Sequence, residues 1–378
     1  MKNKSFLLGF GVILVLMSYS CHLVNTTVKE PIIAKPSFWG RVDSMGRMAY
    51  PGTKAKVCFE GACNVVMHLS DSVVNSDCNP DYVGVIIDRK DTMKISLKDT
   101  TLSKPMIFEQ GKHSIEVVKL TEAQVGVIQF DDFVFTSLGD DFVLRDSAYS
   151  DAPLIEFIGN SITCGYGVED TTNLEGFRSV NQNILKTYGA LVARHYGVEA
   201  LYTAYSGRGM IRNYDGSENN CIPHIYGRVF PDDSLVKYDV KTYTPSVLIL
   251  NIGTNDFNSE HTGKQLNDSL FVAKYQSFVT YLRSVYPKSS IVCAVGPMLS
   301  DGYPEGSNSL TRCLKCVRKV VDDCNQSGDA AVWFFTFTPQ SAPYGEDYHP
   351  SFYTHRRMAQ ELIAFLDAKG ISSQLLAK

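Results

Sequence analysis

One short segment places a serine where it could attack an ester. Residues 155–158, Ile-Glu-Phe-Ile, form a mainly apolar run that ends abruptly in Gly159-Asn160-Ser161, a pattern typical of a buried strand that delivers a hydroxyl to a loop. A serine hydroxyl is a weak nucleophile at neutral pH. It needs a base within hydrogen-bond reach, and donors for the oxyanion that its attack creates. Serine is also common in turns and at helix starts, so Ser161 alone indicates little.

The candidate base is His349, one of eight histidines. It lies in Asp347-Tyr348-His349-Pro350, between a late strand and a C-terminal helix, with an acid close enough to orient the ring. The alternative is a turn histidine whose ring is satisfied by backbone. His355, beside two arginines on the predicted helix, is expected to lie on a solvated face.

Two further loops offer donors for an oxyanion. Asn255 follows a strand-like run, residues 248–252, and its side-chain amide could donate, although asparagine also closes tight turns. The segment Ser206-Gly207-Arg208-Gly209 predicts a loop whose backbone N–H groups can approach a ligand closely, because glycine has no Cβ. A plain flexible loop is the alternative for the latter segment.

Composition favours a neutral substrate. The 378 residues carry a net charge of −4 with no basic cluster, so neither nucleic acid nor an anionic membrane surface is expected as a partner. With 44% hydrophobic residues at this length, two domains are expected. Cys313-x-x-Cys316 lies in a helical pattern and predicts buried small side chains, not a metal site.

The first residues are typical of an export signal. Two lysines precede an apolar run, residues 6–17, that is short for a membrane span. Residues 1–21 are therefore predicted to be a signal peptide of the lipoprotein type, with a lipid on Cys21 as the only membrane attachment; ordinary cleavage nearby is the alternative. The protein is then periplasmic or on the cell surface. Of the ten cysteines, Cys58 and Cys63 could face each other across a hairpin, but no disulfide framework is defined.

Two patterns divide the mature chain. Residues 36–145 alternate in short period-two segments separated by turns, which predicts an all-β sandwich of the jelly-roll kind. Residues 150–378 alternate buried strands, near 154–158, 246–252, 290–296 and 331–336, with helical patterns near 180–196, 268–286, 309–324 and 351–367. That alternation predicts a parallel sheet covered by helices, with Ser161, Asn255 and His349 at the carboxyl ends of its strands.

The four loop segments resemble the four blocks of the SGNH (GDSL-like) hydrolases, with Ser161, Gly207, Asn255 and His349 in the namesake positions. The individual residues of these segments, together with Gly40-Arg41-Val42 and Tyr50-Pro51-Gly52, resemble those of carbohydrate esterase family 2. This resemblance covers nearly all of the mature chain. The resemblance implies a flavodoxin-like α/β domain with helices on both faces of its sheet, preceded by a jelly roll. It also implies deacetylation of acetylated polysaccharide such as xylan or glucomannan, as an acetylxylan esterase does, without cofactor or metal.

Carried over by position, the resemblance makes Ser161 the nucleophile, His349 the base, and Gly207, Asn255 and the Ser161 N–H the oxyanion donors. Two departures stand out: Asn160 replaces the usual aspartate before the serine, and Glu346 has the usual three-residue spacing before the histidine, whereas Asp347 lies two before it. Asp347 is the predicted orienting acid, with a backbone carbonyl as the alternative.

Three other residues are predicted to contact substrate. Tyr348 could stack on a sugar ring or simply pack in its turn, and Arg208 and Tyr166 lie in loops that shape the cleft. Two other functions stay open. A lipase or thioesterase could use the same scaffold, and a surface lipoprotein could bind glycan without catalysis.

Overall fold

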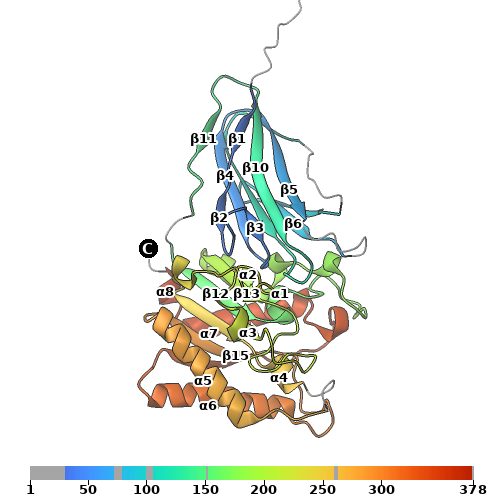
Figure 1. The fold of residues 1–378 in the computed structure, drawn as a ribbon, viewed down its shortest axis with the longest axis vertical. Coiled ribbons are helices and arrows are strands. Elements are labelled where there is room, and N and C mark those ends of the chain that lie inside the picture. Colours follow the sequence, from blue (N-terminus) through green and yellow to red (C-terminus); the bar gives the residue numbers. More distant parts are fainter. Residues whose placement is uncertain (1–29, 72–78, 99–104, 150–151, 259–262, 377–378) are drawn as a thin grey trace, which may run out of the picture. The chain divides into compact units, whose positions relative to one another are not determined.

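The computed structural model describes residues 30–71, 79–98, 105–149, 152–258 and 263–376. The predicted signal peptide and Cys21 lie outside these residues. The part from Pro31 to the C-terminus forms one compact unit, with antiparallel strands first and alternating strands and helices after them (Figure 1).

Two antiparallel sheets form the first part of the chain. One contains β1 (Ile32–Ala34), β10 (Ile128–Ser137), β5 (Cys63–Asp71) and β8 (Met106–Phe108) in that order, with β3 (Arg47–Met48) also paired to β10. The other contains β11 (Val143–Arg145), β4 (Lys54–Glu60), β9 (Lys112–Lys119), β6 (Tyr82–Ile87) and β7 (Asp91–Ser96), with β2 (Ser37–Trp39) paired to β4.

A single apolar core lies between these sheets. Side chains of β4 and β5 alternate between buried and half-buried, as expected when one face of each sheet is covered. Their inward residues, among them Phe59 and Val65, join Phe133 and Phe135 of β10 in that core. The predicted sandwich is confirmed. Cys58 and Cys63 are free thiols: Cys63 is buried in this core, whereas Cys58 lies on the half-buried outer face of β4.

The second part of the chain is built on a parallel sheet. Its strands lie in the order β13 (Glu199–Ala204), β12 (Leu154–Gly159), β14 (Val247–Asn251), β15 (Ser290–Val295) and β16 (Val332–Thr336). This order, 2-1-3-4-5 along the chain, is the flavodoxin-like one. Every residue of β12, β14 and β15 is buried, since helices cover both faces of the sheet.

Four long helices cover that sheet. The helices α2 (Tyr188–Tyr196) and α7 (Phe352–Ala368) pack on one face with Phe157 and Ile249, whereas α5 (Asp268–Val285) and α6 (Ser309–Gln326) pack on the other with Ile158 and Leu250. The predicted helices on both faces are confirmed. Short helices are α1 (Ser161–Cys164), α3 (Ile222–Ile225), α4 (Thr254–Phe257) and α8 (Ser373–Leu376). No helix among the described residues is long and apolar enough to cross a membrane.

The structure differs from the prediction around α2. The helix begins at Tyr188, later than expected, because Thr187 caps it by accepting a hydrogen bond from the Ala190 N–H. It ends at Gly197, which adopts φ +68°, and the edge strand β13 follows two residues later. The sequence prediction missed β13. The glycine followed by the run Glu199–Ala204 was the available signal.

The sandwich strands contact the parallel sheet directly. Trp39 of β2 donates its indole N–H to the carbonyl of Ala200 at 3.0 Å, and Arg41 donates to Thr203 Oγ1 at 2.7 Å. Arg41 also lies 3.5 Å from the buried carboxylate of Glu156 in β12. The division into domains of residues 36–145 and 150–378 stays a prediction, because the whole part from Pro31 clusters as one unit.

Candidate active site

The predicted functional residues meet at the carboxyl edge of the parallel sheet. Ser161 follows β12 and begins α1, Gly207 follows β13, and Asn255 lies in α4 just after β14. Ligands of such sheets bind at this edge, where the strand order reverses between β12 and β14. His349 reaches the same place from the turn before α7.

The turn at Ser161 depends on its two preceding residues. A Cβ on Gly159 would lie 2.2 Å from the hydroxyl of Thr163, so only glycine lets β12 pass so close to the first turn of α1. Asn160 caps α1, because its side-chain oxygen accepts a hydrogen bond from the Ile162 N–H at 3.2 Å. Asn160 therefore serves as the cap of the helix that begins at the nucleophile.

Ser161 and His349 form a hydrogen-bonded pair. The distance between Ser161 Oγ and His349 Nε2 is 2.8 Å. The other ring nitrogen, Nδ1, lies 3.0 Å from the backbone carbonyl of Glu346. A carbonyl only accepts, so Nδ1 carries the proton and Nε2 is left to accept one from the serine. The predicted meeting of serine and histidine is present in the structure.

This geometry corrects the prediction for Asp347. Its carboxylate accepts hydrogen bonds from the Tyr166 hydroxyl at 2.6 Å and the Gly176 N–H at 2.8 Å, and it is the Glu346 carbonyl that meets the ring of His349. The physical reason is the backbone: Asp347 adopts φ +48°, which turns its side chain toward the loop 170–178. Of the two alternatives stated above, the structure has the backbone carbonyl.

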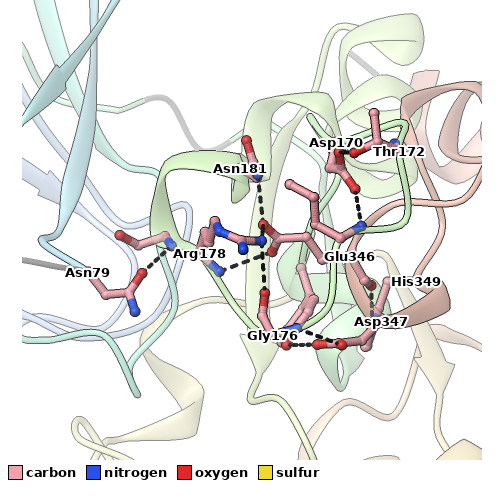
Figure 2. Close-up of polar contacts among 12 residues, drawn as sticks. Asn79, Asp170, Thr172, Gly176, Arg178, Asn181, Glu346, Asp347 and His349 are labelled. Carbon is pink, nitrogen blue, oxygen red and sulfur yellow. Dashed lines mark hydrogen bonds and ion pairs between the residues drawn. The ribbon is translucent and has the colours of Figure 1, made fainter.

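Glu346 holds that turn in place through its side chain (Figure 2). Its buried carboxylate accepts from Asn181 Nδ2 at 2.7 Å and from the Arg178 N–H at 3.1 Å. Its carbonyl accepts from both the N–H and Nδ1 of His349. Sequence reasoning noted the spacing of Glu346 before the histidine but did not assign it this role.

The ring of His349 is covered by Tyr166. The two ring centroids are 4.0 Å apart and the planes are inclined by 21°. Burial disfavours the imidazolium and lowers the pKa of His349 to about 4, although the Glu346 carbonyl and the nearby Asp347 charge act in the opposite direction. The imidazole is therefore neutral and able to accept a proton at pH 7. Tyr166 was predicted to shape the cleft; it also packs on the histidine.

Gly207 and Asn255 are placed to offer donors. Gly207 adopts φ +74°, and among the described residues its N–H donates to no protein acceptor. Asn255 uses one side-chain N–H on the carbonyl of Arg208 at 2.8 Å, which orients the amide and leaves a second N–H. The buried carboxylate of Asp256 accepts from three consecutive N–H groups, residues 210–212, and so ties α4 to this loop.

The predicted substrate contacts occupy the surroundings of the pair. Tyr348 is 61% exposed, and its ring lies 5.5 Å from that of Tyr344, so two neighbouring aromatic rings stand beside His349. Arg208 packs over the ring of Tyr205 and lies 3.6 Å from Asp232, an arrangement that holds its guanidinium near the Gly207 loop.

The prediction for His355 was wrong. The residue is only 1% exposed, and its Nδ1 accepts a hydrogen bond from the N–H of Tyr188 at 3.1 Å. Burial lowers the pKa of His355 to about 3. Its arginine neighbours suggested a solvated face, but the face of α7 that carries His355 also carries Met358 and Leu362 and packs on α2.

Cysteines and metal ligands add no further centre in the described ranges. Cys313 and Cys316 are buried on α6, as predicted. The eight cysteines of those ranges are free thiols, and no group of three or more histidine, cysteine or acidic side chains there is arranged to hold a metal ion.

Two known protein families match separate parts of the chain. Residues 157–357 match the GDSL-like Lipase/Acylhydrolase family, and residues 38–140 match the N-terminal region of carbohydrate esterase 2. The solved structure of a family two carbohydrate esterase from Clostridium thermocellum, in complex with cellohexaose, is similar: 32% sequence identity, a TM-score of 0.75, and coverage of 90% of this chain and 100% of that one.

Two curated proteins are also similar. The cellulase/esterase CelE of Acetivibrio thermocellus is 34% identical over 334 residues, which are 86% of this chain but 39% of that protein. An acetylxylan esterase / glucomannan deacetylase of Cellvibrio japonicus is 22% identical over 324 residues, 85% of this chain and 84% of that protein. The chain belongs to family 2 of the carbohydrate esterases, whose N-terminal region here forms the sandwich and whose GDSL-like region forms the parallel sheet.

Proposed function

We propose that the protein removes O-acetyl groups from polysaccharide through an acetyl-Ser161 intermediate. The observation that carries the proposal is the pair itself: Ser161 Oγ lies 2.8 Å from His349 Nε2, and the Glu346 carbonyl holds the ring in the tautomer that accepts the serine proton. Membership of a carbohydrate esterase family supports the class of substrate.

In the first half-reaction, His349 Nε2 takes the proton of Ser161 as Oγ bonds to the acetyl carbonyl carbon. The carbonyl oxygen becomes an oxyanion, for which the N–H groups of Ser161 and Gly207 and the free side-chain N–H of Asn255 are the proposed donors. The bond from carbon to the sugar oxygen then breaks, and the imidazolium protonates that oxygen. In the second half, His349 takes a proton from water, water oxygen attacks the acetyl carbon, and acetate leaves as the proton returns to Ser161.

The substrate we propose is an acetylated plant polysaccharide, xylan or glucomannan. The exposed ring of Tyr348 and the half-buried ring of Tyr344 beside His349 offer apolar faces on which sugar C–H groups can pack. The curated relative from Cellvibrio japonicus is named for both activities, and the esterase from Clostridium thermocellum was solved with cellohexaose. In this scheme Arg208, near the Gly207 loop, also borders the bound sugar, and Tyr166 acts by covering His349.

Acetate release tests the proposal. We expect protein lacking residues 1–21 to release acetate from acetylated xylan or glucomannan with little turnover of a long-chain acyl ester. Ser161→Ala should lower kcat by about 10⁴-fold or more, as loss of a serine nucleophile does elsewhere. Ser290→Ala is the matched control, because this serine is also buried but lies where β15 begins, at the amino ends of the strands and away from the candidate site.

Three outcomes would contradict it. Equal activity of Ser161→Ala and its parent would exclude the nucleophile. Faster turnover of the long-chain ester would favour a lipase or thioesterase. Glycan binding without hydrolysis of any ester would favour a non-catalytic binding protein.

We also propose that the chain is exported and anchored by a lipid on Cys21. The basic residues and apolar run before Cys21, and relatives that are polysaccharide esterases, support export. Full-length protein expressed in a bacterial host should be found in the membrane fraction, and Cys21→Ser should move it to the soluble fraction. Unchanged partition of the variant would exclude the anchor.

A further inference from the structure

A buried carboxylate of the sandwich part reaches the loops of the candidate active site. Glu122 lies in the connection between β9 and β10 and is fully buried. It accepts hydrogen bonds from Ser206 Oγ at 2.5 Å, from the Ser206 N–H at 2.7 Å and from Gln182 Nε2 at 2.8 Å. The N–H of Glu122 donates in turn to Gln182 Oε1 at 3.0 Å.

The same carboxylate also contacts the helix of the nucleophile. Cys164, three residues after Ser161 in α1, lies beside Glu122: burial, and then the nearby carboxylate, raise the pKa of its thiol. One side chain therefore lies against two segments that are distant in sequence: α1, which begins at Ser161, and the loop that contains Gly207. Neither the proposed chemistry nor the fold of the sandwich itself uses this group.

Its contacts constrain the peptide that contains the Gly207 N–H. Ser206 is held at both its N–H and its hydroxyl by Glu122, and on the other side the Gly207 carbonyl accepts from the Tyr214 N–H at 2.8 Å. The peptide between Ser206 and Gly207 is thus fixed from both ends. A buried carboxylate is costly unless it is paired or fully hydrogen-bonded, and here donors from several segments satisfy it.

We infer that Glu122 is a positioning residue for the oxyanion donor at Gly207, so that the sandwich contributes to catalysis through this one side chain. The inference rests on the proposed function, because an oxyanion forms only if Ser161 attacks an ester. It assigns the sandwich a role in positioning a catalytic loop. Oxyanion donors act through preorganised geometry, so a small rotation of this peptide should lower turnover more than substrate binding.

The test is the conservative variant Glu122→Gln. Glutamine has almost the same shape, but one of its two ends must present an NH₂ group where Glu122 now accepts, so a donor meets a donor at Ser206 or Gln182. We expect kcat for an acetyl ester to fall about 10- to 100-fold with KM changed less than about threefold. Inhibition by a small boronic acid, whose tetrahedral adduct on serine carries an oxygen in the oxyanion position, should weaken in parallel with kcat.

Glu156→Gln is the matched control. Glu156 is also buried at a contact with the sandwich, and it accepts from Thr203 Oγ1 at 2.6 Å and from the Tyr226 hydroxyl at 2.8 Å. It lies in the middle of β12, and neither of these partners belongs to the loop 205–209 that contains Gly207. Its melting temperature should fall as that of Glu122→Gln does, whereas its kcat and boronate inhibition should stay within about twofold of the parent below that temperature.

A second variant keeps the test decisive if Glu122→Gln is poorly folded. Ser206→Ala removes the hydroxyl donor alone and should lower kcat in the same direction, and the double variant should lose less than the product of the two single losses. Unchanged kcat and boronate inhibition in folded Glu122→Gln, or equal losses in Glu156→Gln, would overturn the inference. An inactive parent protein would instead refute the proposed function, so the two failures are distinguishable.

Discussion

The decrease of the reaction rate at acid pH, the acid limb of the pH–rate profile, tests whether burial lowers the pKa of His349. Burial lowers the pKa of His349 to about 4, Tyr166 covers one face of its ring, and the imidazole must be neutral to take the serine proton. A group with a pKa of 4 is about 97% neutral at pH 5.5, whereas one with the ordinary value of 6.5 is about 9% neutral. The structure thus predicts kcat/KM at pH 5.5 close to its plateau, about tenfold above what an unperturbed histidine allows.

Tyr166 provides the perturbation. Tyr166→Ala uncovers the imidazole, so water can solvate its charged form and the pKa should rise toward 6.5. Tyr166→Phe is the matched control, because it keeps the ring over His349 and loses only the hydrogen bond to Asp347. In the alanine variant we expect the acid limb to move up by about one to two pH units, the size of a typical desolvation effect. In the phenylalanine variant the acid limb should stay where it is in the parent.

The assay is acetate release from a small acetyl ester between about pH 3.5 and 8, a range that includes both the lowered and the ordinary histidine pKa. Rates are measured below saturation, so that kcat/KM reports the pKa of the free protein. Far-UV circular dichroism at each pH checks that the protein is folded. A midpoint near 6.5 in the parent protein, or equal shifts in both variants, would refute the reasoning.

Four further predictions concern single residues. Asn255→Ala should lower kcat by about 10²- to 10³-fold with little change in KM, measured on the same ester, because one oxyanion donor is lost; an unchanged kcat would remove Asn255 from the site. Asp347→Asn should lower kcat less than about tenfold, since the Glu346 carbonyl orients the ring, whereas loss of a true triad aspartate costs about 10⁴-fold. Tyr348→Ala should raise KM for acetylated polysaccharide but not for a small acetyl ester, and equal effects on both would argue against sugar stacking. His355 has a pKa of about 3 in the folded protein and is neutral there, so its stabilising effect is complete above about pH 6.5 and declines as the pH falls. In urea titrations, the free energy of unfolding of the parent should therefore fall between pH 6.5 and 5 by about 1.5 kcal/mol more than that of His355→Gln.

Local pattern was enough for much of the fold. Period-two segments predicted the sandwich, and uniformly apolar runs alternating with helical patterns predicted the parallel sheet. The strands β12, β14, β15 and β16 lie within two residues of their expected positions. The edge strand β13 was missed because it is a short run that closely follows a glycine-capped helix. The helical pattern before Gly197 was the only element predicted in that part of the chain.

The candidate site was predictable to the extent that it depends on strand ends. Ser161 and Asn255 follow buried runs, and in a parallel sheet such positions meet at one edge. The partner of the histidine was not predictable in this way. The family resemblance favoured Asp347 although Glu346 has the usual spacing, yet the backbone turn with φ +48° directs the Asp347 side chain away and presents the carbonyl of Glu346 to the ring.

The sequence by itself determined the elements and the residues at their ends, because hydrophobic period and capping residues act within a few positions of the chain. Only the tertiary structure decided which groups meet across long separations. Glu122 contacts Ser206 from 84 positions away, and the burial of His355 depends on packing between α7 and α2. Such pairings are set by how whole elements pack on one another, and no local pattern near Glu122 or His355 encodes them.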